Sequence, residues 1–184
     1  MVGLIIDPTA SARGATTAST AQSAPPLESL AGLRVGLLEN TKRNAAAILD
    51  VIGASLQRSD QVGELIPMTK ENFALPLPDD LLERLTTECD VVLIGVGDCG
   101  SCSASAVADG IMLEARGIPT AVICTEAFEV TATAMAGLKG RPDFPYLRTP
   151  HPIANLEGQQ IADRGTELAA AIRSHLLAGE GKAA

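Results

Sequence analysis

Short runs of apolar residues alternate along most of the chain with stretches in which apolar residues recur every three or four positions. The runs are typical of buried strands, because a strand covered on both faces has no polar side. They predict five strands, at residues 34–39, 62–68, 90–96, 120–124 and 146–149. The spacing of three or four predicts five helices between and after them, since it places apolar side chains on one helix face.

The predicted helices have recognisable starts and core-facing residues. Asn40 or Thr41 is the candidate N-cap of the first helix, and Asp79 or Asp80 of the second. The third helix is predicted at 103–116, the fourth at 127–138 and the fifth at 157–177. The residues expected to face the core are Ala45, Ile48, Leu49, Ile52, Leu56, Leu82, Leu85, Val107, Ile111, Ala115, Ile161, Leu168, Ile172 and Leu176.

Five strands alternating with five helices predict a doubly wound α/β fold: a mostly parallel five-stranded sheet, flavodoxin-like or Rossmann-like, with helices on both faces. The flavodoxin-like order, with the first strand beside the third, is expected. Ligands of such sheets bind beyond the carboxyl ends of the strands, where the strand order reverses. That edge is predicted to gather Asn40, Thr41, Lys42, Asp98, Cys99 and Cys102.

Composition sets the N-terminal part of the chain apart. Residues 10–26 are mostly Ala, Ser, Thr, Gly and Pro without periodicity, so they cannot bury a face of their own. We expect residues 1–33 to form a flexible segment, or an arm that lies on a neighbouring subunit and is anchored by Leu4, Ile5 and Ile6. Residues 34–177 are then a single α/β domain, and 178–184 a flexible tail.

Charge and composition exclude several classes of partner. The formal net charge is −8 and the pI about 4.7, without a cluster of Lys and Arg, so neither nucleic acid nor an anionic membrane is an expected partner. Aromatic residues make up 2% of the chain, which argues against stacking on bases. No apolar run approaches the roughly 18 residues of a membrane span. The start lacks the basic region of a signal peptide, and a cytoplasmic location is expected.

Cys99-Gly100-Ser101-Cys102 stands where a buried strand is predicted to end and a helix to begin. The free N–H groups and the dipole at a helix start favour thiolate over thiol. In a chain without a leader, cysteines are expected to stay reduced. Two further cysteines are expected to be small core residues, Cys89 and Cys124.

Three interpretations of this motif are open. It is a redox or nucleophilic pair in which Cys99 attacks and Cys102 resolves; it is half of a metal site; or its turn cradles a phosphate with N–H groups. A metal would need further ligands from Cys124, His151 or His175. Because the sequence has no second Cys-x-x-Cys, the first interpretation is preferred. No metal or other cofactor is assigned.

Polar residues follow three other predicted strands. Lys42 near Cys99 would favour thiolate or hold a substrate carboxylate. Glu126 is a candidate general acid or base, with helix capping as the alternative. His151 lies between two prolines that fix the local backbone, and imidazole transfers protons near neutral pH. His175, on the last predicted helix, is expected to be a surface residue.

Several segments carry a family resemblance: Leu37-Leu38-Glu39-Asn40-Thr41-Lys42-x-Asn44-Ala45, Gly97-Asp98-Cys99-Gly100-Ser101-Cys102-Ser103, Glu114-x-Arg116-Gly117-Ile118-Pro119-Thr120, Thr125-Glu126-Ala127-Phe128 and Pro150-His151-Pro152. Between about residues 33 and 156 the chain resembles the UGSC-motif family of proteins and selenoproteins, as a form with cysteine in place of selenocysteine. That family is similar, around the motif, to the catalytic subunit of component B of glycine, sarcosine and betaine reductases. The resemblance implies a nucleophilic chalcogen at Cys99 and a helper at Cys102.

The preferred hypothesis is a thiol-dependent enzyme that cleaves or transfers at an activated carbon–heteroatom bond of a small organic substrate. An external dithiol would reset the thiols, and the protein is expected to be a homo-oligomer or one of a pair of subunits. The alternatives are a thiol–disulfide oxidoreductase, a non-catalytic subunit of a larger reductase complex, or a metal-binding module. The predicted catalytic residues are Cys99, Cys102, His151 and Glu126. The predicted substrate-binding residues are Asn40, Thr41, Lys42, Asn44, Asp98, Gly100, Ser101 and Ser103.

Overall fold

The computed structural model describes residues 23–178. Its strands are β1 (Val35–Glu39), β2 (Leu65–Thr69), β3 (Val91–Gly97), β4 (Thr120–Thr125) and β5 (Leu147–Thr149). Its helices are α2 (Ala45–Asp60), α3 (Asp79–Glu88), α4 (Gly100–Glu114), α5 (Glu129–Leu138) and α6 (Gln159–Ala178), with a short 3-10 turn, η1, at Glu126–Phe128. Strand and helix therefore alternate, as the hydrophobic pattern predicts.

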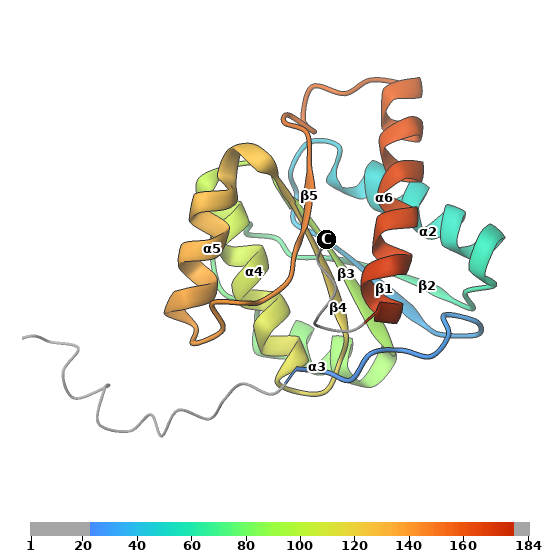
Figure 1. Ribbon diagram of the computed structural model, residues 1–184, viewed down its shortest axis with the longest axis horizontal. Helices are drawn as coiled ribbons and strands as arrows, with labels where there is room; N and C mark the ends of the chain where they lie inside the picture. Colours follow the sequence, from blue (N-terminus) through green and yellow to red (C-terminus); the bar gives the residue numbers. More distant parts are fainter. Residues whose placement is uncertain (1–22, 179–184) are drawn as a thin grey trace, which may run out of the picture.

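The five strands form one sheet in the order β2-β1-β3-β4-β5, and every neighbouring pair is parallel. This is the flavodoxin-like order. Helices α2 and α6 cover one face, and α3, α4 and α5 cover the other (Figure 1). The predicted doubly wound α/β fold is confirmed, and the switch point lies between β1 and β3.

Two apolar clusters hold the layers together, one on each face of the sheet. The central strand β3 is buried along its whole length, which explains why its sequence has no polar face. On one side it packs with Ile48, Ile52 and Ile172 of α2 and α6. On the other side Val107 and Leu85 complete the core.

Part of the segment expected to be an arm belongs to the domain core. Leu30 is 3% exposed, and the Leu27 N–H donates to the carbonyl of Leu176 in α6 at 3.0 Å. The packed body of the domain thus begins near Leu27 rather than at residue 34. The proposed anchor Leu4–Ile6 and the tail 179–184 lie outside the described residues.

Several boundaries differ from the prediction for local reasons. Asn44, not Asn40 or Thr41, is the N-cap of α2. Helix α4 begins at Gly100 and ends at Glu114, so Ala115 is exposed beyond it and not in the core. Ile161, in the first turn of α6, is only half-buried. No helix between residues 23 and 178 combines the length and apolar character needed to span a bilayer.

Candidate functional site

Cys99 links the carboxyl end of β3 to the N-terminus of α4. It is the N-cap residue of that helix: its backbone is extended and its sulfur accepts a hydrogen bond from the Cys102 N–H at 3.4 Å. The Ser101 hydroxyl lies 3.5 Å from the same sulfur. Cys99 is half-buried and Ser101 exposed. A sulfur is thus placed where an N-cap oxygen normally stands, facing the positive end of the helix.

The pKa values of the two thiols of the motif are shifted in opposite directions. Partial burial raises the pKa of Cys99, but hydrogen bonds from Cys102 and Ser101 and the positive charge of Lys42 outweigh it and hold that pKa below its ordinary value. Burial, with the hydrogen bond to Cys99 and the charge of that residue, raises the pKa of Cys102 to about 12. The Cys102 thiol is fully buried and lies 3.3 Å from the Cys99 carbonyl oxygen, to which it donates. Of the two thiols, Cys99 is therefore the one that forms thiolate more readily.

The remaining cysteines belong to the core. Cys89 is 2% exposed and Cys124 is 0% exposed. Burial raises the pKa of Cys89 to about 11 and that of Cys124 to about 12. Both are therefore held as neutral thiols and act as small apolar side chains.

His151 is oriented by Asp98, the residue that precedes Cys99. Its Nδ1 lies 2.9 Å from Asp98 Oδ1 and 3.2 Å from the Thr125 hydroxyl. The Asp98 side chain is 4% exposed and also accepts hydrogen bonds from the N–H groups of Ile153 and Ala154, at 3.2 and 2.9 Å. Asp98 thus acts as a buried orienting carboxylate instead of the substrate ligand that we expected.

The imidazole ring is fixed on its other side as well. Phe128 meets it edge-on, with ring centroids 5.4 Å apart and an interplanar angle of 78°. His151 Nε2 has no hydrogen-bond partner among residues 23–178. Glu126 is exposed in η1, and its carboxylate has no hydrogen bond or ion pair in the described part of the chain. The structure therefore holds the His151 ring in place but does not fix the Glu126 side chain.

We expect His151→Gln to affect chemistry and not folding. Glutamine can still donate to Asp98, which keeps its two backbone partners, so the Tm should change by less than about 3 °C. Loss of a general acid typically lowers turnover by about 10²–10⁴-fold. The measurement is the rate at which a substrate drives oxidation of the thiols, followed by intact mass. His175→Gln, at the opposite sheet edge, is the matched control; equal losses in both variants would show that His151 has no chemical role.

Two asparagines after β1 hold the backbone of the site. The Asn40 side chain pairs with the peptide of Val96 in β3, donating to its carbonyl and accepting from its N–H, both at 3.0 Å. The Asn44 amide donates to the carbonyls of Ile153 and Leu156 at 2.9 Å. Asn40, which is 4% exposed, thus fixes the strand end before Cys99, and Asn44 fixes the loop after His151. Both amides thus have partners within the protein, and their substrate-binding role stays a prediction.

Thr41 and Lys42 lie between these asparagines. The Thr41 hydroxyl donates to the Asn40 carbonyl at 2.6 Å. The Lys42 ammonium sits over the Phe73 ring, 3.8 Å from its centroid, and has no carboxylate partner among the described residues. A cation held by an aromatic face keeps its charge available to a negative group. Lys42 is the residue after β1 best placed to meet an anion.

Ser103 and Gly100 differ from what we expected of substrate ligands. Ser103 is 0% exposed and lies with the Cys124 thiol behind the first turn of α4. Gly100 has open space around its Cα: an added Cβ would find its nearest neighbour, Thr131, at 3.8 Å. Gly100 therefore leaves the approach to Cys99 open, while Ser103 faces the core.

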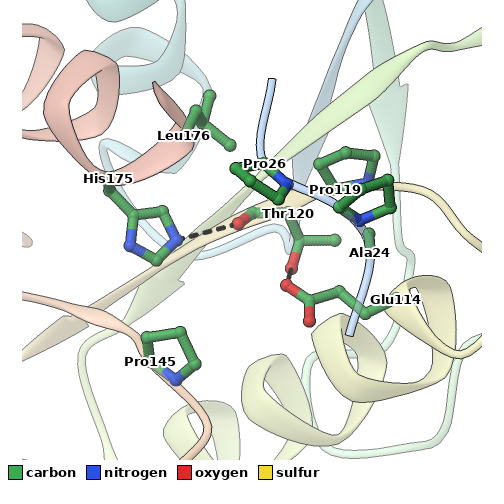
Figure 2. Close-up of a pocket in the computed structure, with 9 residues that line it drawn as sticks. Ala24, Pro26, Glu114, Pro119, Thr120, Pro145, His175 and Leu176 are labelled. Atoms are coloured by element: carbon green, nitrogen blue, oxygen red, sulfur yellow. Dashed lines mark hydrogen bonds between the residues drawn. The ribbon is translucent and has the colours of Figure 1, made fainter. Parts of the chain in front are cut away.

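Residues 23–178 hold no cluster of metal ligands, and a small cavity lies at the amino edge of the sheet, away from Cys99. Between residues 23 and 178 no group of three or more His, Cys, Asp or Glu side chains is arranged to hold a metal ion. A cavity of about 30 Å³ lies at the opposite edge of the sheet, lined by Glu114, Thr120 and His175 among others (Figure 2). The His175 ring there meets the Thr120 carbonyl at 3.0 Å, so this histidine is part of the packing, not simply exposed.

Sequence reasoning missed three groups that complete the site. Thr125 and Phe128 orient His151 from the end of β4, and Phe73 holds Lys42 from the loop after β2. Phe73 and Phe128 are two of only three phenylalanines in the chain. Their position after predicted strands, in so aromatic-poor a sequence, was the available signal.

Fold and site together define a doubly wound α/β protein. At the switch point of its sheet, a cysteine with a lowered pKa caps a helix. The sequence comparisons narrow this class. The model of the UGSC family matches residues 4–178, nearly the whole chain, and the protein belongs to that family. The match begins within the segment that composition sets apart and ends at the last residue of α6.

Two further comparisons add nothing on activity. A solved flavodoxin-like domain of a Synechococcus protein is 18% identical, and the alignment covers 76% of this chain and 91% of that chain with a TM-score of 0.36. No curated protein sequence matches the chain. The resemblance to the reductase subunit therefore stays a prediction.

Proposed function

We propose that this protein is a thiol-dependent enzyme in which Cys99 attacks a small anionic organic substrate and Cys102 resolves the product. The observation that carries the proposal is the contrast between the two sulfurs. Cys99 caps a helix, is accessible and has a lowered pKa, whereas Cys102 is buried one turn later with a pKa of about 12. Such a pair suits one attacking and one waiting thiol.

The chemistry balances as a two-electron reduction of a substrate R–X, where X is the heteroatom. The Cys99 thiolate attacks X, forming an S–X bond and breaking R–X; R leaves with the electron pair and takes a proton from His151. Cys102 then gives its proton to His151 and attacks the Cys99 sulfur, which forms the disulfide and expels X. X takes that proton as HX. One R–X and two thiols thus give R–H, HX and one disulfide, which an external dithiol reduces.

The order of the two thiols follows from their mutual influence. Burial is the largest cause of the raised pKa of Cys102, and the hydrogen bond to Cys99 and the negative charge of Cys99 add to it. Once Cys99 carries X, that charge is gone and the pKa of Cys102 falls. Cys102 therefore becomes a better nucleophile after the first step than before it.

Lys42 supports an anionic substrate. Its ammonium has an aromatic face below it and no ion-pair partner among residues 23–178, and its charge reaches both sulfurs of the motif. A carboxylate or similar group on the substrate would supply the missing partner and hold the reacting bond near Cys99.

The test is a reversible disulfide between Cys99 and Cys102. Incubation with a mild oxidant should remove the mass of two hydrogens per chain, protect both residues from alkylation, and be reversed by a dithiol. Two residues in one helical turn can bring their sulfurs into bonding range with little backbone movement. Cys102→Ser should lose the reaction and Cys89→Ser should keep it. A bridge mapped to Cys89 or Cys124, or no mass loss, would overturn the resolving role.

A further inference from the structure

A buried ion pair joins Lys70 to Asp109 of α4, the helix that Cys99 caps. Lys70 follows β2 directly and Asp109 lies on α4, and their side chains are 3% and 1% exposed and in direct contact. Neither residue takes part in the steps above. Burying two charges is costly unless their geometry and hydrogen bonds repay the desolvation, so the surroundings of this pair indicate what it holds in place.

The pair fastens both ends of the loop 70–78 to helix α4. At the start of the loop, Lys70 Nζ contacts Asp109 and donates to the Ser105 hydroxyl at 2.7 Å. Towards its end, the Leu77 N–H donates to Asp109 Oδ1 at 3.1 Å, and the Ser105 hydroxyl donates to the Leu75 carbonyl at 2.8 Å. Burial raises the pKa of the Asp109 carboxyl, while the Lys70 charge and the Leu77 N–H oppose that rise.

The middle of this loop reaches the thiol site. Phe73 lies within it and carries the Lys42 ammonium on its ring, and the Thr41 hydroxyl contacts the Glu71 carbonyl at 3.5 Å. Helix α4, to which the loop is fastened, is the helix that Cys99 caps. The ion pair thus ties the support of Lys42 and the cap of the helix to one rigid element.

We propose that Asp109 and Lys70 are positioning residues of the thiol site. They fix the loop 70–78 on α4 and thereby hold Phe73 in place. Phe73 in turn keeps the Lys42 ammonium near the Cys99 sulfur. The inference rests on the proposed function, because it concerns the same thiolate. The groups that act on Cys99 are Cys102 and Ser101 on α4 and Lys42 after β1, and the Asp98–His151 pair lies next to them at the end of β3. Only Lys42 depends on the loop.

The experiment measures the rate of Cys99 alkylation by iodoacetamide against pH, in the full chain. The rate rises with pH as thiolate forms, so loss of a nearby positive charge moves the midpoint upward. We expect Asp109→Asn and Phe73→Leu each to raise the midpoint by about half a pH unit, the effect of a single charge at about 10 Å in a partly aqueous environment. In a Lys42→Met background neither change should shift the midpoint further, because the charge that the loop positions is already gone.

Glu114→Gln is the matched control, since Glu114 is a buried carboxylate at the far end of the same helix. It should lower the Tm without moving the midpoint. A folded Asp109→Asn protein with the wild-type midpoint would overturn the inference, as would an additive shift in the Lys42→Met background. If Asp109→Asn does not fold, Phe73→Leu decides, because it leaves the ion pair intact. If instead Cys99 is not the fast-reacting thiol of the wild type, it is the proposed function that fails.

Discussion

Iodoacetamide at neutral pH is expected to alkylate Cys99 at least about thirtyfold faster than Cys124. Burial raises the pKa of Cys124 to about 12, whereas hydrogen bonds and the Lys42 charge hold the pKa of Cys99 below its ordinary value. Even a thiol of ordinary pKa, about 8.5, has a thiolate fraction more than about a thousandfold larger than that of Cys124. The thiolate of the more acidic thiol is the weaker nucleophile, which reduces the difference in alkylation rate by about thirtyfold. The full burial of Cys124 adds to the difference, because that residue reacts only when the core opens.

Peptide mapping after brief labelling checks this result, and Cys99→Ser removes the fast phase altogether. Cys89→Ser is the control, because Cys89 is buried with a pKa of about 11 and its loss should leave the fast phase unchanged. Equal labelling of Cys99 and Cys124 in the folded protein would contradict both the assignment of the nucleophile and the proposed chemistry.

Gly97→Ala is expected to destabilise the protein by about 1–3 kcal/mol, the usual cost of overpacking a core. A Cβ on Gly97 would lie 2.7 Å from both the Cys124 sulfur and the Ser103 hydroxyl, and 2.9 Å from the Ser103 Cα. Because Ser103 lies in the first turn of α4, this contact would push the helix start away from β3. Thermal or urea unfolding measures the loss, and slower labelling of Cys99 should accompany it.

Gly100→Ala is the matched control three residues along the chain. Its added Cβ meets only Thr131, at 3.8 and 4.0 Å, and alanine at a helix start limits the unfolded chain more than glycine does. Its stability should stay equal or rise by about 0.5 kcal/mol. Similar losses in both variants would show that the close contact behind Gly97 does not determine packing at the motif.

The fold could be predicted because its cause is local and repeated. Buried strands such as β3 need continuous apolar runs, and helices need periodic ones, so hydrophobic patterning carries the alternation directly. The same pattern placed Cys99 at a strand end and His151 at the same sheet edge. Boundaries were less certain, because Asn44 starts α2 without capping it through its side chain; its amide binds the loop after His151, a partner far away in sequence.

The details of the site depend on long-range pairs that no sequence window contains. Asn40 was predicted to meet substrate, but no local pattern indicates that its amide also pairs with the Val96 peptide 56 residues away. Asp109 is a buried carboxylate in the middle of α4, off the core face predicted for that helix. A carboxylate there signals a buried partner, but only the folded chain shows that the partner is Lys70.

In the proposed function, the nucleophile Cys99 is also a structural part of the helix that presents it. Its sulfur accepts the Cys102 N–H and closes the first turn of α4. A sulfur that carries a substrate fragment is a poorer acceptor, and loss of an N-cap typically costs about 1 kcal/mol. Covalent capture of the substrate would therefore fray the start of α4. That fraying would give Cys102, on the same turn, freedom to approach the Cys99 sulfur.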